Sequence, residues 1–220
     1  MRMVLLRLGG IASLAALTAS CLMPSERPRD VPASDMKRLG TDNTLRPVAD
    51  FESLTVRSQR SAALFTEAAR VIESPRCLNC HPSDRTPTQG NDLHAHTPLM
   101  RANDAGHGPP GLDCATCHQG ANVVTNSSSI ESIPGHAHWM LAPSSMSWQG
   151  KKTSEICAQI KDPARNGGRS LESLREHMAR DTLVGWAWSP GPGRTPAPGT
   201  QAQFGELIGA WIETGADCPL

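Results

Sequence analysis

The chain has 220 residues, with 21 basic and 21 acidic side chains and a formal net charge of zero. This balance argues against a broad basic surface of the kind that binds nucleic acid, so nucleic acid is not an expected partner. Three Phe, five Trp and no Tyr stand against 19 Gly and 18 Pro. Such a composition predicts many turns and a small side-chain core, so that another group is expected to fill part of the interior.

The chain begins with MRMVLLRLGGIASLAALTAS, in which two arginines precede an apolar run that ends in small residues. This pattern predicts an export signal over residues 1–20, because the run is too short to cross the ~30 Å hydrocarbon core of a bilayer. Cys21 follows at the position of the lipidated cysteine of bacterial lipoproteins, although Thr18 stands where their signals usually carry leucine. We favour lipidation of Cys21, and cleavage nearby without lipidation is the alternative. The mature chain is therefore expected in the periplasm, with this anchor as its only membrane contact.

Residues 21–48 are polar and dotted with proline, which predicts a flexible tether behind the anchor. A folded domain is expected to follow over residues 49–220. Its first helix is predicted over residues 50–73, where apolar residues recur at helical spacing between the cap Asp50 and the helix breaker Pro75.

A loop-rich segment is predicted over residues 77–150, where Gly, Pro, Asn and Ser are frequent. The C-terminal part, residues 151–220, is expected to be helical, with helices over residues 153–162, 170–181 and 200–215. The last helix has the clearest signal, since Thr200 and Gln203 form a capping box and Gly215 ends the apolar stripe. The expected fold class is mainly α with extensive irregular loops.

Two copies of a Cys-x-x-Cys-His motif lie in the loop segment, CLNCH at residues 77–81 and CATCH at residues 114–118. This spacing suits covalent attachment of c-type haem, in which two cysteine sulfurs bond the porphyrin edge and the histidine binds the iron. A His-Ala-His triplet follows each motif, so the two halves are interpreted as copies of one site. The predicted cofactors are two haem c groups, bound through Cys77, Cys80, Cys114 and Cys117, with His81 and His118 as proximal iron ligands.

The cysteine pairs have three other interpretations. A zinc ribbon is the main alternative, but 33 residues separate Cys80 from Cys114, and a ribbon does not explain a histidine after both pairs. A thioredoxin-like redox site needs an ordered helix after the motif, which Pro82 opposes. Disulfides within each pair leave the many nearby histidines unexplained.

Export also bears on the remaining cysteines, because thiols outside the cytoplasm tend to form disulfides unless another group binds them. Seven cysteines are present in total. One lipid, two haems and one disulfide account for all of them, which predicts a disulfide between Cys157 and Cys218.

The second axial ligand of each iron decides between electron transfer and chemistry at an open metal. The expected arrangement is bis-histidine, with His96, His107 and His138 as the distal candidates. His107 precedes the second motif in a stretch similar to one that carries an iron ligand in small multihaem cytochromes. Methionine ligation by Met100 or Met140 is the rival. A sixth histidine, His177, lies in a charged helical segment and is assigned a structural role.

Other residues are expected to surround the porphyrins. Trp139, Trp148, Trp186 and Trp188 are interpreted as packing against porphyrin faces rather than as an electron relay. The candidate partners of the haem propionates are Arg76, Arg85, Arg101 and Lys151.

Seven segments carry a wider likeness: CLNCH, HAHTP, GHGPPGLDCATCHQ, GHAHW, EICAQIKDPARNGGRS, LVGWAW and APGTQAQFGELIGAWIETGADCP. Through them, residues 77–220 resemble a group of small exported dihaem cytochromes of bacteria that are often labelled "isoquinoline 1-oxidoreductase subunit". The resemblance implies a redox partner, a molybdenum hydroxylase that oxidises aldehydes or N-heterocycles. No segment of this chain looks like a molybdopterin or flavin site, so those groups are expected on the partner.

The sequence as a whole predicts a small multihaem cytochrome c fold, with two covalently bound haems in place of a large side-chain core. The expected function is periplasmic electron transfer between a dehydrogenase-type donor and the respiratory chain, without enzymatic activity of its own. The alternative is a small dihaem peroxidase-like enzyme with one open iron site.

Overall fold

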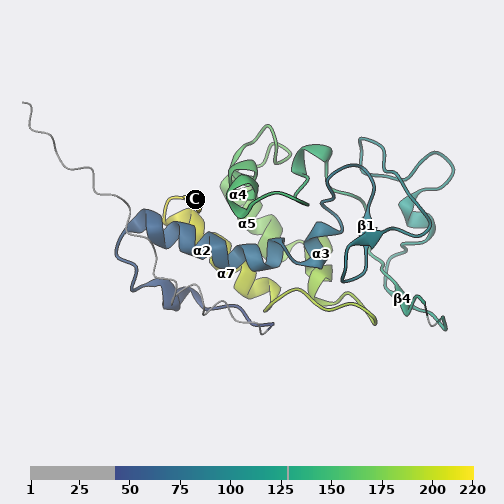
Figure 1. The fold of residues 1–220 in the computed structure, drawn as a ribbon, viewed down its shortest axis with the longest axis horizontal. Helices are drawn as coiled ribbons and strands as arrows, with labels where there is room; N and C mark the ends of the chain where they lie inside the picture. The colour runs from purple at the N-terminus through teal and green to yellow at the C-terminus, as the bar shows by residue number, and fades with distance from the viewer. Residues whose placement is uncertain (1–42, 128) are drawn as a thin grey trace, which may run out of the picture. The chain divides into compact units, whose positions relative to one another are not determined.

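The computed structural model describes residues 43–127 and 129–220. The predicted export signal, Cys21 and most of the predicted tether lie outside these residues. The described part is mainly helical, and its strands are two residues long (Figure 1). In chain order the elements are η1 (Val48–Phe51), α2 (Arg57–Ile72), α3 (Pro75–Leu78), β1 (Thr88–Gln89), β2 (His94–Ala95), η2 (Cys114–Thr116), β3 (Val123–Val124), β4 (Ser132–Ile133), η3 (Ser144–Met146), α4 (Thr153–Lys161), α5 (Leu171–Arg180), α6 (Thr182–Gly185), η4 (Trp186–Trp188) and α7 (Gln201–Glu213).

The longer helices pack around a side-chain core. Helix α7 lies against both α2 and α5 (Figure 1). Phe65 of α2 and Trp211 of α7 are fully buried, and their ring centroids are 4.9 Å apart. The Ser61 hydroxyl donates to the carbonyl of Trp211 over 3.1 Å, which ties the two helices together at the same level. The helical part therefore has a packed core of its own, which the scarcity of aromatic residues did not suggest.

The first helix differs from the prediction of residues 50–73. A 3-10 turn, η1, comes first, and α2 begins only at Arg57 behind Val56, whose side chain cannot cap it. Asp50 instead forms an ion pair with Arg46 over 3.3 Å. The physical reason is burial of Phe51, which is 3% exposed and sits in the core because the chain turns between η1 and α2.

The folded domain also begins earlier than the predicted boundary at residue 49. Leu45 is buried in the core, and the backbone N–H of Arg46 donates to Glu67 over 3.1 Å. Asn43 accepts a hydrogen bond from the backbone N–H of Gly199. The end of the predicted tether is therefore part of the domain from residue 43 onward.

The C-terminal helices follow the sequence signals closely. The Thr200 hydroxyl accepts the N–H of Gln203 over 3.2 Å, and the Gln203 side chain accepts the N–H of Thr200 over 3.1 Å, so the capping box is confirmed. Ser170 caps α5 with a single hydrogen bond, in which its hydroxyl accepts the N–H of Ser173 over 3.1 Å. Helices α4 and α5 begin and end within a residue or two of the predicted ranges. The short helices α6 and η4 were not predicted, because single turns carry no periodicity.

A disulfide joins Cys157 of α4 to Cys218, with an S–S distance of 2.02 Å. This is the pairing that the cysteine count predicts. It links the C-terminal tail to α4, and Cys157 is fully buried in the helical core.

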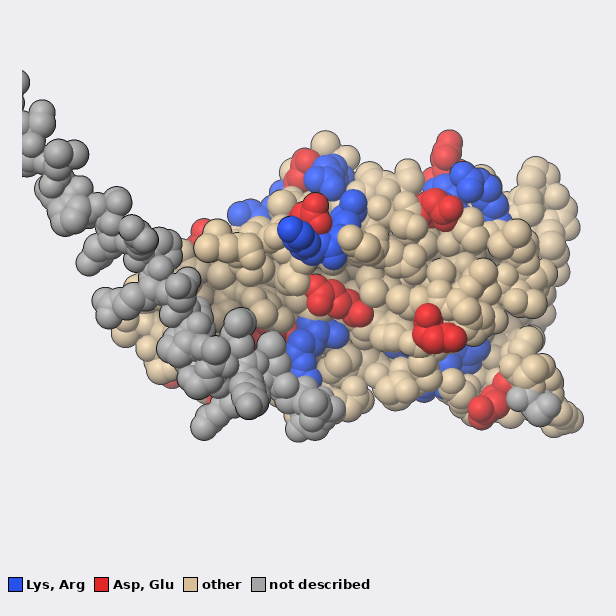
Figure 2. All heavy atoms as spheres, in the orientation of Figure 1, with Lys and Arg blue, Asp and Glu red and all other residues tan. Residues whose placement is uncertain are grey.

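The loop segment has two small antiparallel hairpins. Strand β1 pairs with β2, and β3 pairs with β4. Each hairpin follows one Cys-x-x-Cys-His motif and precedes or includes the first histidine of a His-Ala-His triplet, so the sequence repeat is visible in the backbone. On the face shown in Figure 2, acidic and basic side chains alternate in small groups.

The loop segment contains little buried apolar surface. Between residues 79 and 147, position 128 aside, the buried hydrophobic residues are Ala102 and Leu141. The same stretch exposes six large hydrophobic side chains: Leu99, Leu112, Val123, Val124, Ile130 and Met140. This part of the domain therefore lacks the side-chain core that the helical part has.

None of the helices within residues 43–127 and 129–220 is long and apolar enough to span a membrane.

Replacing both Cys157 and Cys218 by alanine is expected to lower the free energy of unfolding by about 2–4 kcal/mol, because the unfolded chain regains the freedom of a long loop. The two cysteines are 61 positions apart. Denaturant unfolding of the exported protein measures the change. A reducing agent is the matched control, since it should destabilise the wild type by a similar amount and leave the double variant unaffected. Equal unfolding midpoints for the wild type with and without the reducing agent would contradict this prediction.

Candidate functional site

The first Cys-x-x-Cys-His motif folds as one helical turn. Pro75 opens α3 at a position where proline is favoured. The N–H of His81 donates to the carbonyl of Cys77 over 3.0 Å, so the turn continues through the motif. Residues three and four apart share one face of such a turn. Cys77, Cys80 and His81 are therefore presented together.

The second motif repeats this geometry. The Asp113 carboxylate accepts the N–H of Cys114 over 2.7 Å and opens the 3-10 turn η2. The N–H of His118 then donates to the carbonyl of Cys114 over 2.9 Å, the same pairing as in the first motif. Two segments of different sequence thus place two cysteines and a histidine in the same order on one turn.

Each of the two histidines is held by a backbone carbonyl. Nδ1 of His81 lies 2.7 Å from the carbonyl oxygen of Met146, and Nδ1 of His118 lies 2.8 Å from that of Pro134. A carbonyl oxygen only accepts, so Nδ1 carries the proton and Nε2 keeps its lone pair. Burial lowers the pKa of His81 to about 4 and also lowers the pKa of His118, which keeps both rings neutral. A neutral imidazole oriented in this way is the form that ligates a metal.

A tryptophan stacks on each of these imidazoles. The rings of His81 and Trp148 are stacked, with centroids 3.5 Å apart, and those of His118 and Trp139 are stacked at 4.7 Å. Trp186 meets Trp139 edge-on at 4.9 Å. Trp188 instead packs near Phe204 of the helical core and donates to the carbonyl of Pro198. The four tryptophans were all expected to pack against porphyrin faces, but their surroundings differ. Trp148 and Trp139 stack on the predicted iron ligands.

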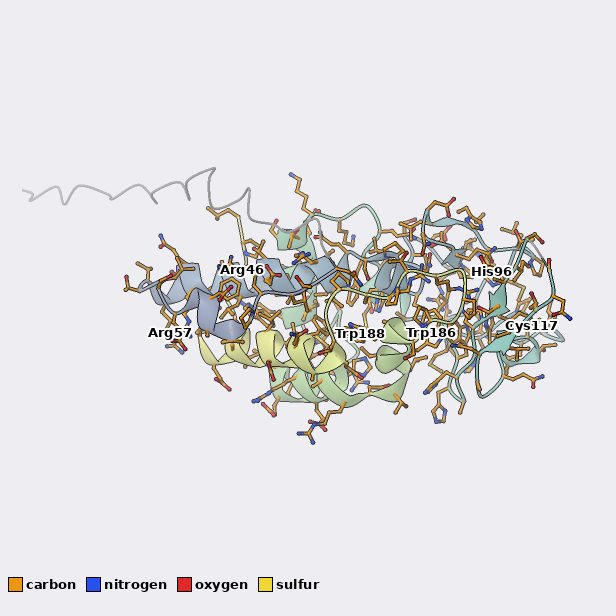
Figure 3. The ribbon with its side chains drawn as sticks, turned by 90° about the horizontal axis from the view of Figure 1, so that it is seen from below. Arg46, Arg57, His96, Cys117, Trp186 and Trp188 are labelled. Atoms are coloured by element: carbon orange, nitrogen blue, oxygen red, sulfur yellow. A yellow bond between two sulfur atoms is a disulfide. The ribbon has the colours of Figure 1, made fainter. Side chains whose placement is uncertain are left out.

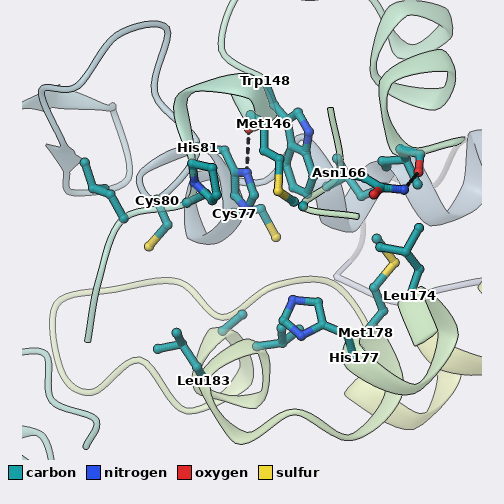
Figure 4. Close-up of a pocket in the computed structure, with 18 of the residues that line it drawn as sticks. Cys77, Cys80, His81, Met146, Trp148, Asn166, Leu174, His177, Met178 and Leu183 are labelled. Carbon is teal, nitrogen blue, oxygen red and sulfur yellow. Dashed lines mark hydrogen bonds between the residues drawn. The ribbon is translucent and has the colours of Figure 1, made fainter. Parts of the chain in front are cut away.

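A cavity of about 380 Å³ opens in front of the first motif, and most of its lining is apolar (Figure 4). This volume is within the ~300–1,000 Å³ typical of small-molecule and cofactor sites. One side of the cavity carries Cys77, Cys80 and His81, and the other is formed largely by α4, α5 and α6. The first motif therefore faces an apolar space instead of packed side chains.

The thiols of the first motif are kept in their neutral form. Cys77, Cys80, Cys114 and Cys117 are all free. Burial raises the pKa of Cys77 to about 12 and that of Cys80 to about 11, and it also raises the pKa of Cys114. Redox-active and zinc-binding cysteines depend on thiolates, which a lowered pKa favours. The surroundings of Cys77 and Cys80 suit an uncharged sulfur, such as that of a thioether.

Several polar atoms at the cavity lack partners. Within residues 43–127 and 129–220, no hydrogen-bond partner lies at Nε and Nη1 of Arg76, at Nε1 of Trp148 or at Oε1 of Gln159. All three side chains line the cavity, and Arg76 is only 2% exposed. A buried guanidinium with unused donors is costly unless an anionic or polar group meets it. An apolar group with carboxylates at its edge, such as haem, fits this site.

The other proposed propionate partners are placed differently. Arg85 is buried, but its guanidinium donates to the carbonyls of Ala142 and Asn103 and does not line the cavity. Arg101 is 70% exposed, beside Asp84 at 4.0 Å. Lys151 does not line the cavity either. Arg165 and Arg169, which the sequence did not single out, do line it.

At the second motif, one expected distal ligand lies close to the histidine. The rings of His96 and His118 have centroids 5.8 Å apart. Nδ1 of His96 lies 2.8 Å from the carbonyl of Pro98, so Nε2 is left as the free ring nitrogen. His96 follows the first motif in the sequence, but it lies beside the histidine of the second motif. A simple repeat, in which each His-Ala-His triplet serves the motif before it, would have placed it at the first motif. Figure 3 shows His96 and Cys117 toward the same end of the domain.

The remaining distal candidates contact neither predicted proximal histidine. His107 is partly exposed, with Nδ1 3.7 Å from Oδ1 of Asp113, and the ring centroid of His138 lies 5.8 Å from that of His136. Neither residue lines the cavity, and of the two methionine alternatives Met140 does and Met100 does not.

His177 was assigned a structural role, but it lines the cavity on the side opposite the first motif (Figure 4). Asp181 accepts from its Nδ1 over 3.0 Å. The spacing of four between histidine and aspartate in a helical segment is the sequence signal that could have indicated this arrangement. No local pattern shows that the ring faces the first motif, which lies almost a hundred residues earlier.

Among the described residues, no three His, Cys, Asp or Glu side chains converge as a site for a bare metal ion. Haem iron takes four of its ligands from the porphyrin, so a haem site does not need such a group.

No protein-family model matches the chain, and no curated protein or solved structure is significantly similar to it.

The thiol environment predicts a reactivity order in the exported chain made without haem attachment. At pH 8, iodoacetamide should alkylate the exposed Cys117 quickly and the partly exposed Cys77, whose pKa is raised, slowly. Raising the pH should increase the alkylation rate of Cys77 by about tenfold per pH unit, because its thiolate fraction still grows below its pKa of about 12. Peptide mass spectrometry over time measures both rates. Alkylation of Cys77 at pH 8 as fast as that of Cys117 would instead indicate a redox-active or metal-binding thiol.

Proposed function

We propose that the chain is a periplasmic electron carrier with two covalently bound c-type haems. Cys77 and Cys80 would hold one haem and Cys114 and Cys117 the other. The observation that carries the proposal is a hydrogen bond that occurs in both motifs. In each of them the histidine donates from Nδ1 to a backbone carbonyl, which leaves Nε2 for iron. The cysteines of both motifs are free in the same structure that bridges Cys157 and Cys218.

The zinc alternative is less well supported. A structural zinc site needs about four thiolate or imidazole ligands that converge on one point. Among the described residues, no three His, Cys, Asp or Glu side chains converge in this way. The apolar cavity beside them also suits a large planar ligand better than a bare ion.

The two proposed sites share a side chain. Trp139 stacks on His118 of the second motif and also lines the cavity of the first. When bound, each haem supplies a one-electron change at its iron. The chain contributes the iron ligands, an apolar surrounding that excludes water, and a short connection between the sites through Trp139.

The second site is the better candidate for contact with a redox partner. Cys117 is exposed, whereas Cys77, Cys80 and Cys114 are each only partly exposed. Large apolar side chains are also exposed in this segment, among them Val124 at 67%. The proposed partner is a dehydrogenase-type donor such as a molybdenum-containing enzyme, and electrons would pass onward to the respiratory chain. A lipid on Cys21 would keep the carrier at the membrane.

A dihaem peroxidase is the second candidate. It is favoured by the finding that none of His96, His107 and His138 lines the cavity of the first motif. An iron there without a sixth ligand would be open to peroxide.

Spectroscopy of the exported protein separates the two functions. For a carrier we expect two one-electron reductions, a reduced spectrum that carbon monoxide does not change, and negligible turnover of hydrogen peroxide. These results follow if both irons have two protein ligands. Carbon monoxide binding together with rapid peroxide turnover would contradict the carrier and support the peroxidase.

A further inference from the structure

We propose that His177 is the distal iron ligand of the haem bound by Cys77 and Cys80. This inference rests on the proposed function and deepens it, because it completes the first site with a residue from a distant helix. The position of His177 carries the inference. It belongs to α5 and lines the cavity across from His81, and its ring points into the cavity (Figure 4).

The ring of His177 is oriented as a metal ligand requires. Nδ1 lies 3.0 Å from Oδ2 of Asp181. The other carboxylate oxygen of Asp181 accepts the N–H of Leu183 over 2.8 Å, so the start of α6 holds the aspartate in place. A carboxylate on Nδ1 fixes the tautomer with a free Nε2 and makes that nitrogen a stronger ligand. No described residue forms a hydrogen bond with Nε2 of His177.

The first and second sites would then have the same design. In each of them, one imidazole on a Cys-x-x-Cys-His turn faces a second imidazole whose Nδ1 is already bonded. The second site pairs His118 with His96, and the first pairs His81 with His177. The partner of Nδ1 is a backbone carbonyl for three of these rings and a carboxylate for His177.

Other histidines are not available to the first site. His94 has both ring nitrogens engaged, with Asp92 and Gln89. His136 also uses both, with Thr182 and with the backbone N–H of His138. Neither His94 nor His136 lines the cavity, and the histidines of the described residues that do line it are His81 and His177.

Three methionines line the cavity as well, and each is less well placed. Met146 lies on the same side of the cavity as His81, and the backbone carbonyl of Met146 is the one that holds the His81 ring. Met178 is packed into the hydrophobic core beside Leu174 and Phe204. Met140 is 37% exposed. A thioether ligand would nevertheless give a spectrum distinct from that of a histidine ligand.

A purely structural role for His177 has little to support it. Its side chain is 25% exposed and that of Asp181 is 37% exposed, and solvent weakens the contribution of such a partly exposed pair to stability. Asp181 also caps α6 without help from the histidine.

The test compares H177A with H94A in the exported, haem-loaded protein. We expect both variants to retain two covalent haems by intact mass. In H177A one of the two haems should become high-spin and bind carbon monoxide after reduction, while the other stays low-spin. H94A should match the wild type, because His94 is exposed and does not line the cavity.

A second variant, H177M, covers the case in which H177A does not fold, since methionine is a good helix former. It should keep one haem six-coordinate, add a near-infrared sulfur-to-iron band and raise the midpoint potential of that haem. A wild type without covalent haem would overturn the proposed function itself. A haem-loaded H177A that stays low-spin and silent to carbon monoxide would overturn the His177 inference alone, as would an H177M without the band. A near-infrared band in the wild type would identify a methionine as the ligand instead.

Discussion

A backbone carbonyl holds the histidine of each Cys-x-x-Cys-His motif by its Nδ1 atom, and the account of both sites depends on this hydrogen bond. Without it either ring nitrogen could carry the proton, and a free imidazole would lose orientational freedom on binding a metal. For His81 and His118 that orientation is set in advance. The carbonyls come from Met146 and Pro134, so the loops that follow the motifs serve to position the rings.

The loop segment explains why covalent attachment suits this fold. Its buried apolar residues between 79 and 147, position 128 aside, are Ala102 and Leu141, while the helices pack a full core around Trp211. A segment with so little buried apolar surface gains little stability from its own side chains. Thioether bonds through Cys114 and Cys117 would supply both an apolar surface and a crosslink at that place. The helical part, closed by the Cys157–Cys218 disulfide, does not depend on them in the same way.

The sequence predicted a structural element correctly where all the residues that determine it are neighbours in the chain. The capping box of Thr200 and Gln203 gave the start of α7 because two reciprocal hydrogen bonds are encoded three residues apart. The start of α2 was misplaced because Asp50 looks like a cap, whereas burial of Phe51 decides the path of the chain. The distal ligands were harder still. Which histidine faces which motif depends on how segments far apart in the sequence pack, and local patterns do not contain that information.

The covalent haem content is the central claim, and intact-mass spectrometry of the natively exported, denatured protein tests it most directly. The account predicts one species whose mass equals the processed polypeptide plus two haem groups, with the haem still attached after extraction with acidified organic solvent. A polypeptide mass without added porphyrin, or haem that the solvent removes, would contradict it.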